Sequence, residues 1–271
     1  MATFLILILL AVLLGRYFYF QPKFDATTLK LSGLEALLRF CNEKGEILPP
    51  TFLPVLYQQG LSQVVDAKVV DLAFEQVLEW RQQGFFPPSV AINFDKDFLL
   101  NKEAVEQFIT RAKQDNILFT IEITEHTYTV EVKALAVVVG ALRAAGHRIS
   151  IDDFGAGYSS LTTLLALEAD EIKLDRQLVI APQREDTRGK ILLATSTQLC
   201  HDLGFSVVAE GVETEEQLQL VRRCGADIIQ GYHLGKPMQA NQVCDLFDEE
   251  GNYNYSHKDV QQRFMDEQLS A

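Results

Sequence analysis

The sequence predicts an α/β fold, a modified TIM (β/α)₈ barrel whose first strand runs antiparallel to the rest. Three observations predict it. Two strand-like runs near the N-terminus are joined by a short connection, six further strand-like runs alternate with helical patterns, and the whole set fits within residues 16–250. Strands that alternate with helices indicate parallel pairing through crossover connections. Eight strands with their helices in a segment of this length are typical of a closed barrel.

The first two strands are expected at residues 17–24 and 29–40, where strand-forming apolar and aromatic residues dominate. Only four residues, DATT, separate the two runs, and so short a connection permits antiparallel pairing alone. Residues 49–60 and 62–84 follow, with apolar residues three and four positions apart and a glycine closing each segment. That spacing predicts two helices.

The rest of the domain repeats a strand and a helix six times. The strands are expected at 89–94, 118–124, 148–153, 171–175, 205–210 and 227–230. The helices are expected at 102–114, 129–146, 159–168, 187–204, 214–225 and 241–250. One domain therefore spans residues 16–250, and the polar residues 251–271 are expected to form a solvated C-terminal extension.

The N-terminal segment of residues 1–15 contains eleven consecutive apolar residues, 4–14, which is short of the roughly 20 that a spanning helix needs. It lacks a basic leader and a following A-x-A site. Three interpretations stay open: a shortened membrane anchor, an apolar first helix packed on the domain, or the apolar core of a signal peptide. Arg16, Lys23 and Lys30 follow it, so any membrane association through residues 4–14 would leave the domain on the cytoplasmic side.

The composition excludes some classes of function. The formal net charge of −13 disfavours binding to long nucleic acids, which are held by neutralisation of phosphates with Lys and Arg. A phosphate-bearing substrate would need metal ions to offset the repulsion. The four cysteines form no CxxC pair, which indicates reduced thiols in a cytosolic compartment and neither a zinc nor a redox site.

Polar residues gather where the predicted strands end, and in such barrels the chemistry lies at the C-terminal ends of the strands. These residues are Gln21, Glu35, Arg39, Asn93, Glu122, Glu125, Asp152, Asp153, Lys173, Asp175, Glu210 and Gln230. Any single acid there is commonly a helix cap or a salt-bridge partner. So many carboxylates converging on one mouth would be tolerated mainly with cations among them. Oxygen and amide ligands without clustered His or Cys favour Mg²⁺ or Mn²⁺ over zinc.

The adjacent Asp152 and Asp153 suit a two-metal site, because one carboxylate can bridge two ions while its neighbour reaches only the second. Such a pair activates water for in-line attack on a phosphodiester. A lysine beside it orients the water or neutralises charge developing on phosphorus. The DFG in this stretch also occurs in protein kinases, but no HRDxxxxN loop or VAIK strand accompanies it.

Six motifs in order, GLEALLRF, IEITE, DDFGAGYSSL, IKLD, VVAEGVET and QGYHLGKPM, closely resemble those of the EAL-domain phosphodiesterases. The resemblance runs from about residue 16 to about residue 247. It implies metal-dependent hydrolysis of the bacterial messenger cyclic di-GMP to linear pGpG with two Mg²⁺ or Mn²⁺ ions per site. It also implies a homodimer and a cytoplasmic catalytic domain, tethered to the inner membrane if residues 4–14 insert there.

The resemblance further implies a role for each matching residue. Glu35, Asn93, Glu122 and Asp152 would bind metal, Asp153 would serve the second metal, and Gln230 would hold a metal-bound water. Lys173, Glu210 and Asp153 would act in catalysis, with Lys173 on the water or phosphate and Glu210 as general base or second-metal partner. Gln21, Leu37 and Arg39 would contact the dinucleotide, and Glu125, Asp175 and Glu213 would brace the site and the DDFGAGYSS loop.

The chain departs from the family pattern in two places. Asp95 replaces a small hydroxyl residue, and Leu56 and Tyr57 stand where Ala and Glu are usual. Neither removes a predicted metal ligand, although Asp95 adds charge where substrate would bind. The alternative function is a non-catalytic cyclic di-GMP receptor, which would commonly lack one of the acids or Lys173; this chain has all of them.

Overall fold

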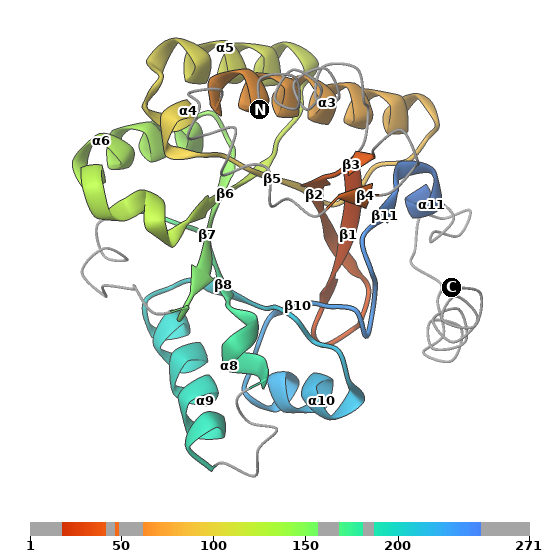
Figure 1. Cartoon of the computed structure of the whole chain (residues 1–271), viewed down its shortest axis with the longest axis vertical. Coiled ribbons are helices and arrows are strands. Elements are labelled where there is room, and N and C mark those ends of the chain that lie inside the picture. The colour runs from red at the N-terminus through yellow and green to blue at the C-terminus, as the bar shows by residue number, and fades with distance from the viewer. Residues whose placement is uncertain (1–17, 42–46, 49–61, 157–167, 181–186, 245–271) are drawn as a thin grey trace.

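The computed structural model describes residues 18–41, 47–48, 62–156, 168–180 and 187–244, without the side chains of 40–41, 47–48, 62 and 125–131. Its strands form a ring with the helices outside it (Figure 1). The segments predicted at 1–15 and 251–271, and the helices predicted at 49–60 and 159–168, lie outside the described residues.

The predicted N-terminal hairpin is confirmed. Strand β1 (Phe18–Asp25) pairs antiparallel with β2 (Leu31–Leu38), and Gln21 lies opposite Glu35. The Asp25 carboxylate accepts hydrogen bonds from the backbone of Thr27 and Thr28 at 3.1 and 2.6 Å. An acid at the start of a turn commonly makes such bonds, which fix the reversal of the chain here.

The remaining strands complete the predicted barrel. In spatial order after β2 they are β5 (Val90–Asn93), β6 (Thr120–Thr124), β7 (Arg148–Phe154), β8 (Glu171–Leu174), β9 (Ser206–Ala209) and β10 (Ile228–Gln230). All of these pairs are parallel. Strand β10 closes the ring antiparallel to β1, and the short β11 (Met238–Gln239) also pairs with β1. The first strand therefore runs against its neighbours, as predicted.

Most helices fall where the apolar spacing placed them. The described helices are α3 (Ser62–Gln82), α4 (Lys96–Leu100), α5 (Lys102–Asp115), α6 (Glu125–Ala144), α8 (Arg176–Ile180), α9 (Thr187–Asp202), α10 (Glu215–Arg223) and α11 (Ala240–Cys244). Asn101 caps α5 by accepting the Ala104 N–H, and Thr214 and Gln217 form a capping box on α10. Helix α6 begins four residues before its predicted start, directly after β6.

Several short elements were not predicted. Helices α4 and α8 have five residues each, and strands β3 (Phe40–Cys41) and β4 (Ile47–Leu48) have two each. A helix of five residues has fewer than two turns, and a strand of two residues has at most one alternation of side chains. Neither is long enough to show a periodic pattern of apolar residues.

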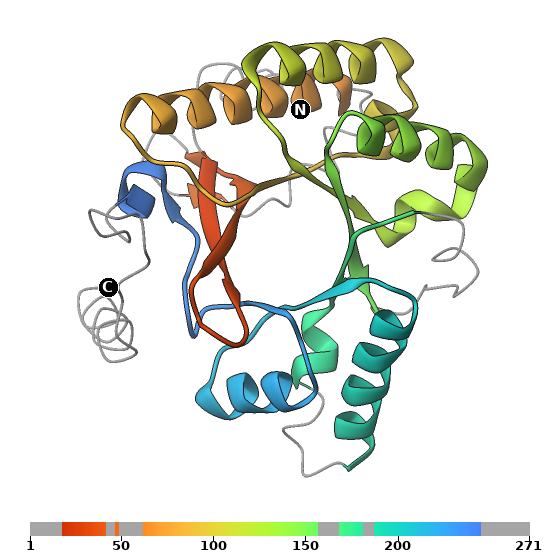
Figure 2. The ribbon, with the colours of Figure 1, turned by 180° about the vertical axis from the view of Figure 1, so that it is seen from behind.

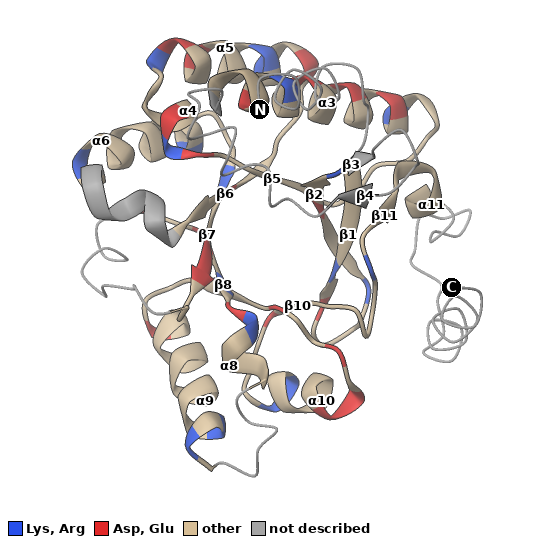
Figure 3. Cartoon of the chain, in the orientation of Figure 1, with Lys and Arg blue, Asp and Glu red and all other residues tan. Residues whose placement is uncertain are grey.

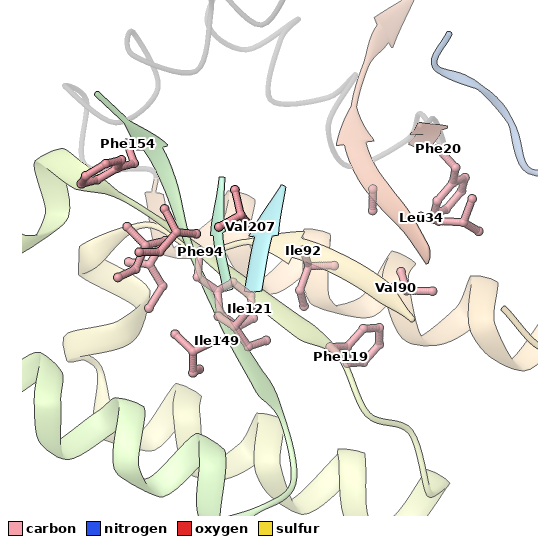
Figure 4. Close-up of a cluster of buried hydrophobic side chains, with 14 of the residues drawn as sticks. Phe20, Leu34, Val90, Ile92, Phe94, Phe119, Ile121, Ile149, Phe154 and Val207 are labelled. Atoms are coloured by element: carbon pink, nitrogen blue, oxygen red, sulfur yellow. The ribbon is translucent and has the colours of Figure 1, made fainter. Parts of the chain in front are cut away.

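The hydrophobic core lies between the strands and the surrounding helices (Figures 2 and 4). Phe74 of α3 packs edge-on against Phe119, with ring centroids 5.0 Å apart, and against Phe108 of α5 at 5.7 Å. Ile121 and Ile149 are fully buried on adjacent strands. This apolar layer leaves the opposite face of each strand for the barrel interior, where the polar residues lie.

Among the helices in the described ranges, none is both long enough and apolar enough to cross a bilayer.

Candidate active site

The structure brings most of the predicted site residues together at the C-terminal ends of the barrel strands. Figure 3 shows acidic residues on β7 and close to β8 and β10, around the opening of the ring. Alternation along each strand buries one set of side chains under the helices and turns the other set inward. The inward set includes Glu35 of β2, Asn93 of β5, Glu122 of β6, Asp152 of β7, Lys173 of β8 and Gln230 of β10.

Three of the inward carboxylates form a compact group. Glu35, Glu122 and Asp152 each place one oxygen within 4.8 Å of the others. Asn93 donates from Nδ2 to Glu35 at 3.1 Å and to Glu122 at 3.2 Å, and Gln230 donates from Nε2 to Glu35 at 2.6 Å. The two amides therefore fix how the carboxylates are oriented.

A second group contains Asp152, Asp153 and Glu210, again with one oxygen of each within 4.8 Å of the others. Strand β7 has an irregularity in its pairing with β8 between Ile151 and Phe154, which lets both aspartates reach the site. Asp153 takes the left-handed conformation, with φ of 61°, and its N–H donates to Asp152 Oδ1 at 2.8 Å. Asp152 belongs to both groups and so stands between them.

Lys173 lies at the centre of the acids. Its Nζ is 2.8 Å from Glu210, 3.0 Å from Glu122, 3.1 Å from Asp152 and 3.5 Å from Glu35, and the side chain is 1% exposed. Burial alone would lower the pKa of Lys173, but the charges of Asp152, Glu122 and Glu210 raise it well above its usual value. The lysine is therefore a permanent cation in the site.

The acids respond differently to burial. Burial raises the pKa of Glu35 to about 7, with the charge of Glu122 adding to the effect, and raises that of Glu210 to about 8. Burial would also raise the pKa of Glu122, but Lys173 and Lys23 lower it to about 2. Glu122 is thus ionised throughout the physiological range, whereas Glu35 and Glu210 can hold protons until another cation arrives.

The donor set fits a divalent cation. Its atoms are carboxylate and amide oxygens, which are the ligands of hard cations such as Mg²⁺ and Mn²⁺. Gln230 gives a separate indication: its buried Oε1 has no hydrogen-bond partner among the described residues, although its Nε2 is bound to Glu35. An acceptor held this way, beside the acids, can take a hydrogen bond from a water molecule in the site.

A cavity of about 310 Å³ lies beside β2, β5 and α3, and Asn93, which is hydrogen-bonded to Glu35 and Glu122, forms part of its lining. Its lining includes Leu37, Arg39, Asn93 and Asp95. The Arg39 guanidinium donates to the carbonyl of Leu38 at 3.0 Å, and no other hydrogen bond from it is seen to the described residues, so its other N–H groups can serve a ligand. Asp95 caps α4 by accepting the N–H of Lys96 at 2.6 Å, which gives this departure from the family pattern a structural role.

The remaining predicted residues lie around this centre. Gln21 is buried and donates to the carbonyl of Gly235 at 3.2 Å. Asp175 accepts the N–H of Gln177 at 2.8 Å at the start of α8, and Glu213 pairs with Arg176 at 2.8 Å. The side chain of Glu125 and residues 157–167 lie outside the described residues, so the bracing of the loop stays a prediction.

Sequence reasoning missed Lys23 as a site residue and assigned it to the basic residues after the apolar segment. In the structure Lys23 is 3% exposed, inside the barrel, with Nζ 2.8 Å from Glu122. Burial alone would lower its pKa, but the charges of Glu122 and Glu171 raise it. The only signal in the sequence was its position two residues after Gln21 on the same alternating strand.

Comparison with known proteins identifies the family that the sequence motifs indicated. The model of the EAL domain family matches residues 15–237. The bifunctional diguanylate cyclase/cyclic di-GMP phosphodiesterase MucR of Pseudomonas aeruginosa is 34% identical over 229 residues, which cover 83% of this chain and 33% of that protein. The chain spans about a third of the length of the first curated relatives that it matches.

Two solved structures are informative. The phosphodiesterase of Pseudomonas aeruginosa MucR in complex with c-di-GMP superposes with a TM-score of 0.82 and 31% identity, covering 89% of this chain and 99% of that one. A manganese and cyclic di-GMP complex of Klebsiella pneumoniae BlrP1 has a TM-score of 0.70 and 28% identity, covering 82% of this chain and 56% of that one.

Proposed function

Because the chain belongs to the EAL domain family, we propose that it hydrolyses cyclic di-GMP to linear pGpG with the help of divalent cations. One observation carries the proposal: Asp152 belongs to both three-carboxylate groups, so a single side chain can bridge two cations. Paired cations of this kind serve in-line hydrolysis of phosphodiesters. The names of the relative and the neighbour from Pseudomonas aeruginosa support the same chemistry and the same ligand.

The cations we propose are two Mg²⁺ or two Mn²⁺ ions. Glu35, Asn93, Glu122 and Asp152 would hold one, and Asp152, Asp153 and Glu210 the other, by the grouping of their oxygens. Bound there, the ions would supply a Lewis acid for the phosphate and lower the pKa of a water molecule. The manganese complex of BlrP1 agrees with an oxygen-rich site of this kind.

The protein's own groups would divide the remaining work. Gln230 Oε1 would accept a hydrogen bond from the attacking water and so hold it near Glu35. Glu210, grouped with Asp152 and Asp153 and 2.8 Å from Lys173, would accept a proton from that water as general base or would hold the second cation. Lys173 would stay charged and offset the negative charge that develops on the phosphate.

The cavity beside the acids is the proposed binding site for the dinucleotide. Arg39 would contact a phosphate through its free N–H groups, since a guanidinium matches phosphate oxygens in pairs. Leu37 would lie against a guanine base. Gln21, which is hydrogen-bonded to Gly235 on β1's side of the barrel, would also contact the dinucleotide, and Asp95 adds a negative charge to the cavity wall.

The experiment is turnover of cyclic di-GMP by the purified full chain with Mg²⁺ or Mn²⁺, followed by chromatography. Asp152→Asn keeps the shape of the side chain and removes its charge, so pGpG formation should fall by about 100-fold or more, since several kcal/mol of charge stabilisation disappear. Asp202→Asn, on the exposed face of α9, is the matched control and should leave turnover unchanged. Cyclic di-GMP binding without turnover by the folded wild-type chain would instead support the receptor function.

Two further proposals rest on the sequence: a homodimer on the family resemblance, and membrane association on the apolar run of residues 4–14. We propose that the chain forms a homodimer, which sedimentation or light scattering of the full chain tests directly. We also propose that residues 4–14 associate with a membrane and leave the catalytic domain in the cytoplasm. Fractionation of the full chain beside a version that begins at Arg16 tests this, and equal distribution of the two would contradict it.

A further inference from the structure

A second buried lysine, Lys23, lies below the proposed metal site and has no part in the chemistry described above. It extends from β1 across the interior of the barrel to β6, where its Nζ is 2.8 Å from Glu122 Oε1. The same Nζ is 3.7 Å from Glu171 Oε1, and that oxygen accepts a hydrogen bond from Ser150 at 2.9 Å. The strand register places Glu122, Ser150 and Glu171 in one row across β6, β7 and β8.

Glu122 divides its two oxygens between two environments. Oε1 is bound to Lys23, whereas Oε2 is bound to Lys173 at 3.0 Å and to Asn93 at 3.2 Å. Lys173 and Asn93 also contact Glu35, so Oε2 is the oxygen that faces the acid group. Glu122 itself is completely buried. Its orientation is thus fixed by protein groups on both sides and not by solvent.

We propose that Lys23 is a positioning residue for the metal site, which acts by holding the Glu122 carboxylate turned so that Oε2 faces the cation. The inference rests on the proposed function, because it concerns how a ligand of that site is held. Groups that orient a metal ligand from behind commonly contribute 10- to 100-fold to metal affinity. Lys23 binds the Glu122 oxygen that is turned away from Glu35, so it lies behind this ligand.

The opposing effect is the charge of Lys23, which would repel a cation bound nearby. Glu171 offsets it, because a carboxylate 3.7 Å from the ammonium cancels much of its field at longer distance. The hydrogen bond from Lys23 to Glu122 acts only at short range, so Glu171 does not weaken the hold of Lys23 on the orientation of Glu122. Lys23 and Glu171 together therefore orient the ligand while adding little net charge to the site.

Calorimetric titration of the metal-free full chain with Mn²⁺ measures the effect without any turnover. Lys23→Met should weaken Mn²⁺ binding by about 10- to 100-fold. Glu171→Gln keeps Lys23 on Glu122 and removes only the charge that offsets it, so it should weaken Mn²⁺ binding by less than Lys23→Met does, and a loss as large as that of Lys23→Met would overturn the proposal. Lys23→Gln keeps a hydrogen-bond donor and should recover part of the loss.

The double variant Lys23→Met with Glu171→Gln separates positioning from the mere burial of an unpaired acid. Without Lys23, Glu171 would be left as a buried carboxylate with no cation beside it, and Glu171→Gln removes that charge. The double variant can therefore be titrated with Mn²⁺ if Lys23→Met alone does not fold. Weak Mn²⁺ binding in a folded double variant supports the proposal, whereas wild-type or tighter affinity in it overturns the proposal. Wild-type chain that binds no Mn²⁺ would overturn the proposed function as well, and that outcome is distinct from equal binding by wild type and variant.

Discussion

The ammonium nitrogen of Lys173 lies 2.8 Å from Oε1 of Glu210, inside the barrel. Three more carboxylates lie within 3.5 Å of the same nitrogen. One lysine thus neutralises part of the charge of four acids, and this attraction stabilises the metal-free site. A divalent cation that binds there would contact some of the same carboxylates.

Lys173→Met should therefore destabilise the metal-free protein by about 3 to 5 kcal/mol, the usual effect of removing one partner from a buried ion pair. The acids left behind repel one another, so Mn²⁺ should raise the melting temperature more in the variant than in wild type. Thermal unfolding in EDTA and in Mn²⁺ measures both effects. Lys190→Met, on the exposed side of α9, is the control. Equal stability of wild type and Lys173→Met in EDTA would contradict the prediction.

Metal affinity should rise with pH between about 6 and 9. The pKa of Glu35 is raised to about 7 and that of Glu210 to about 8, both first through burial, so each holds a proton on the acid side of this range. A cation must displace those protons, and binding is weaker when they are present. Titration with Mn²⁺ at pH 7 in buffers of different ionisation enthalpy should show proton release. Identical heats in all buffers would mean that neither acid is protonated in the free protein.

The acids of the site could be predicted from the sequence because the C-terminal ends of all parallel strands in a barrel lie at the same opening. A residue near the end of a strand is therefore close to the ends of the other strands. Glu122 and Asp152 lie on consecutive strands that are separated by a helix in the sequence, and the two side chains meet if these strands are parallel neighbours. Once the alternation of strands and helices was clear, the convergence of these side chains followed.

Lys23 could not be predicted, for a physical reason. A lysine within a few residues of a turn is usually solvated, and its partner Glu122 is 99 residues away. Only closure of the barrel brings β1 across from β6. The left-handed backbone of Asp153 is likewise set by the irregular pairing of β7 with β8, which is not encoded in any local pattern.

Asp153→Asn should remove the second cation while preserving the fold. Asn tolerates the left-handed conformation that Asp153 adopts, with φ of 61°, so the free energy of unfolding should change by less than about 1 kcal/mol. The amide carries no charge, so Mn²⁺ stoichiometry in calorimetry should fall from two to one. Asp153→Ala should lose the same ion and in addition about 1 kcal/mol through backbone strain. Two ions still bound to Asp153→Asn would remove this residue from the proposed ligand set.

His147 should make the fold sensitive to acid. The ring is 3% exposed, its Nδ1 accepts the Phe119 N–H at 3.2 Å, and it lies 4.9 Å from the ring of Phe108. Burial lowers the pKa of His147 to about 4, below the unfolded value of about 6.5. The unfolded chain therefore binds the proton first, and stability is full above pH 6.5 and falls as the pH approaches 4.

The expected loss for His147 at pH 5 is about 1 to 2 kcal/mol relative to pH 7.5. Urea unfolding at the two pH values measures it. His147→Phe keeps an aromatic ring and cannot titrate, so its stability should change less with pH than that of wild type. A difference between the two proteins that does not depend on pH would show that the histidine has no such effect.

Gly231 directly follows β10 and lies against the backbone of Val212, which follows β9. Both strands carry site residues at their ends, so Gly231→Ala should disturb the site. A Cβ there would overlap the backbone of Val212, and Val212 is hydrogen-bonded to the Gln230 carbonyl at 3.2 Å. The overlap should lower stability by about 3 kcal/mol or more and displace Gln230 from the site, reducing proposed turnover by roughly 10- to 100-fold. Gly204→Ala is the control: its φ of +88° is unfavourable for alanine, but no atom of the described residues lies within 4 Å of the added carbon. Gly204→Ala should lose only about 1 kcal/mol and keep its turnover, so equal behaviour of the two variants would show that the contact with Val212 does not hold the site in place.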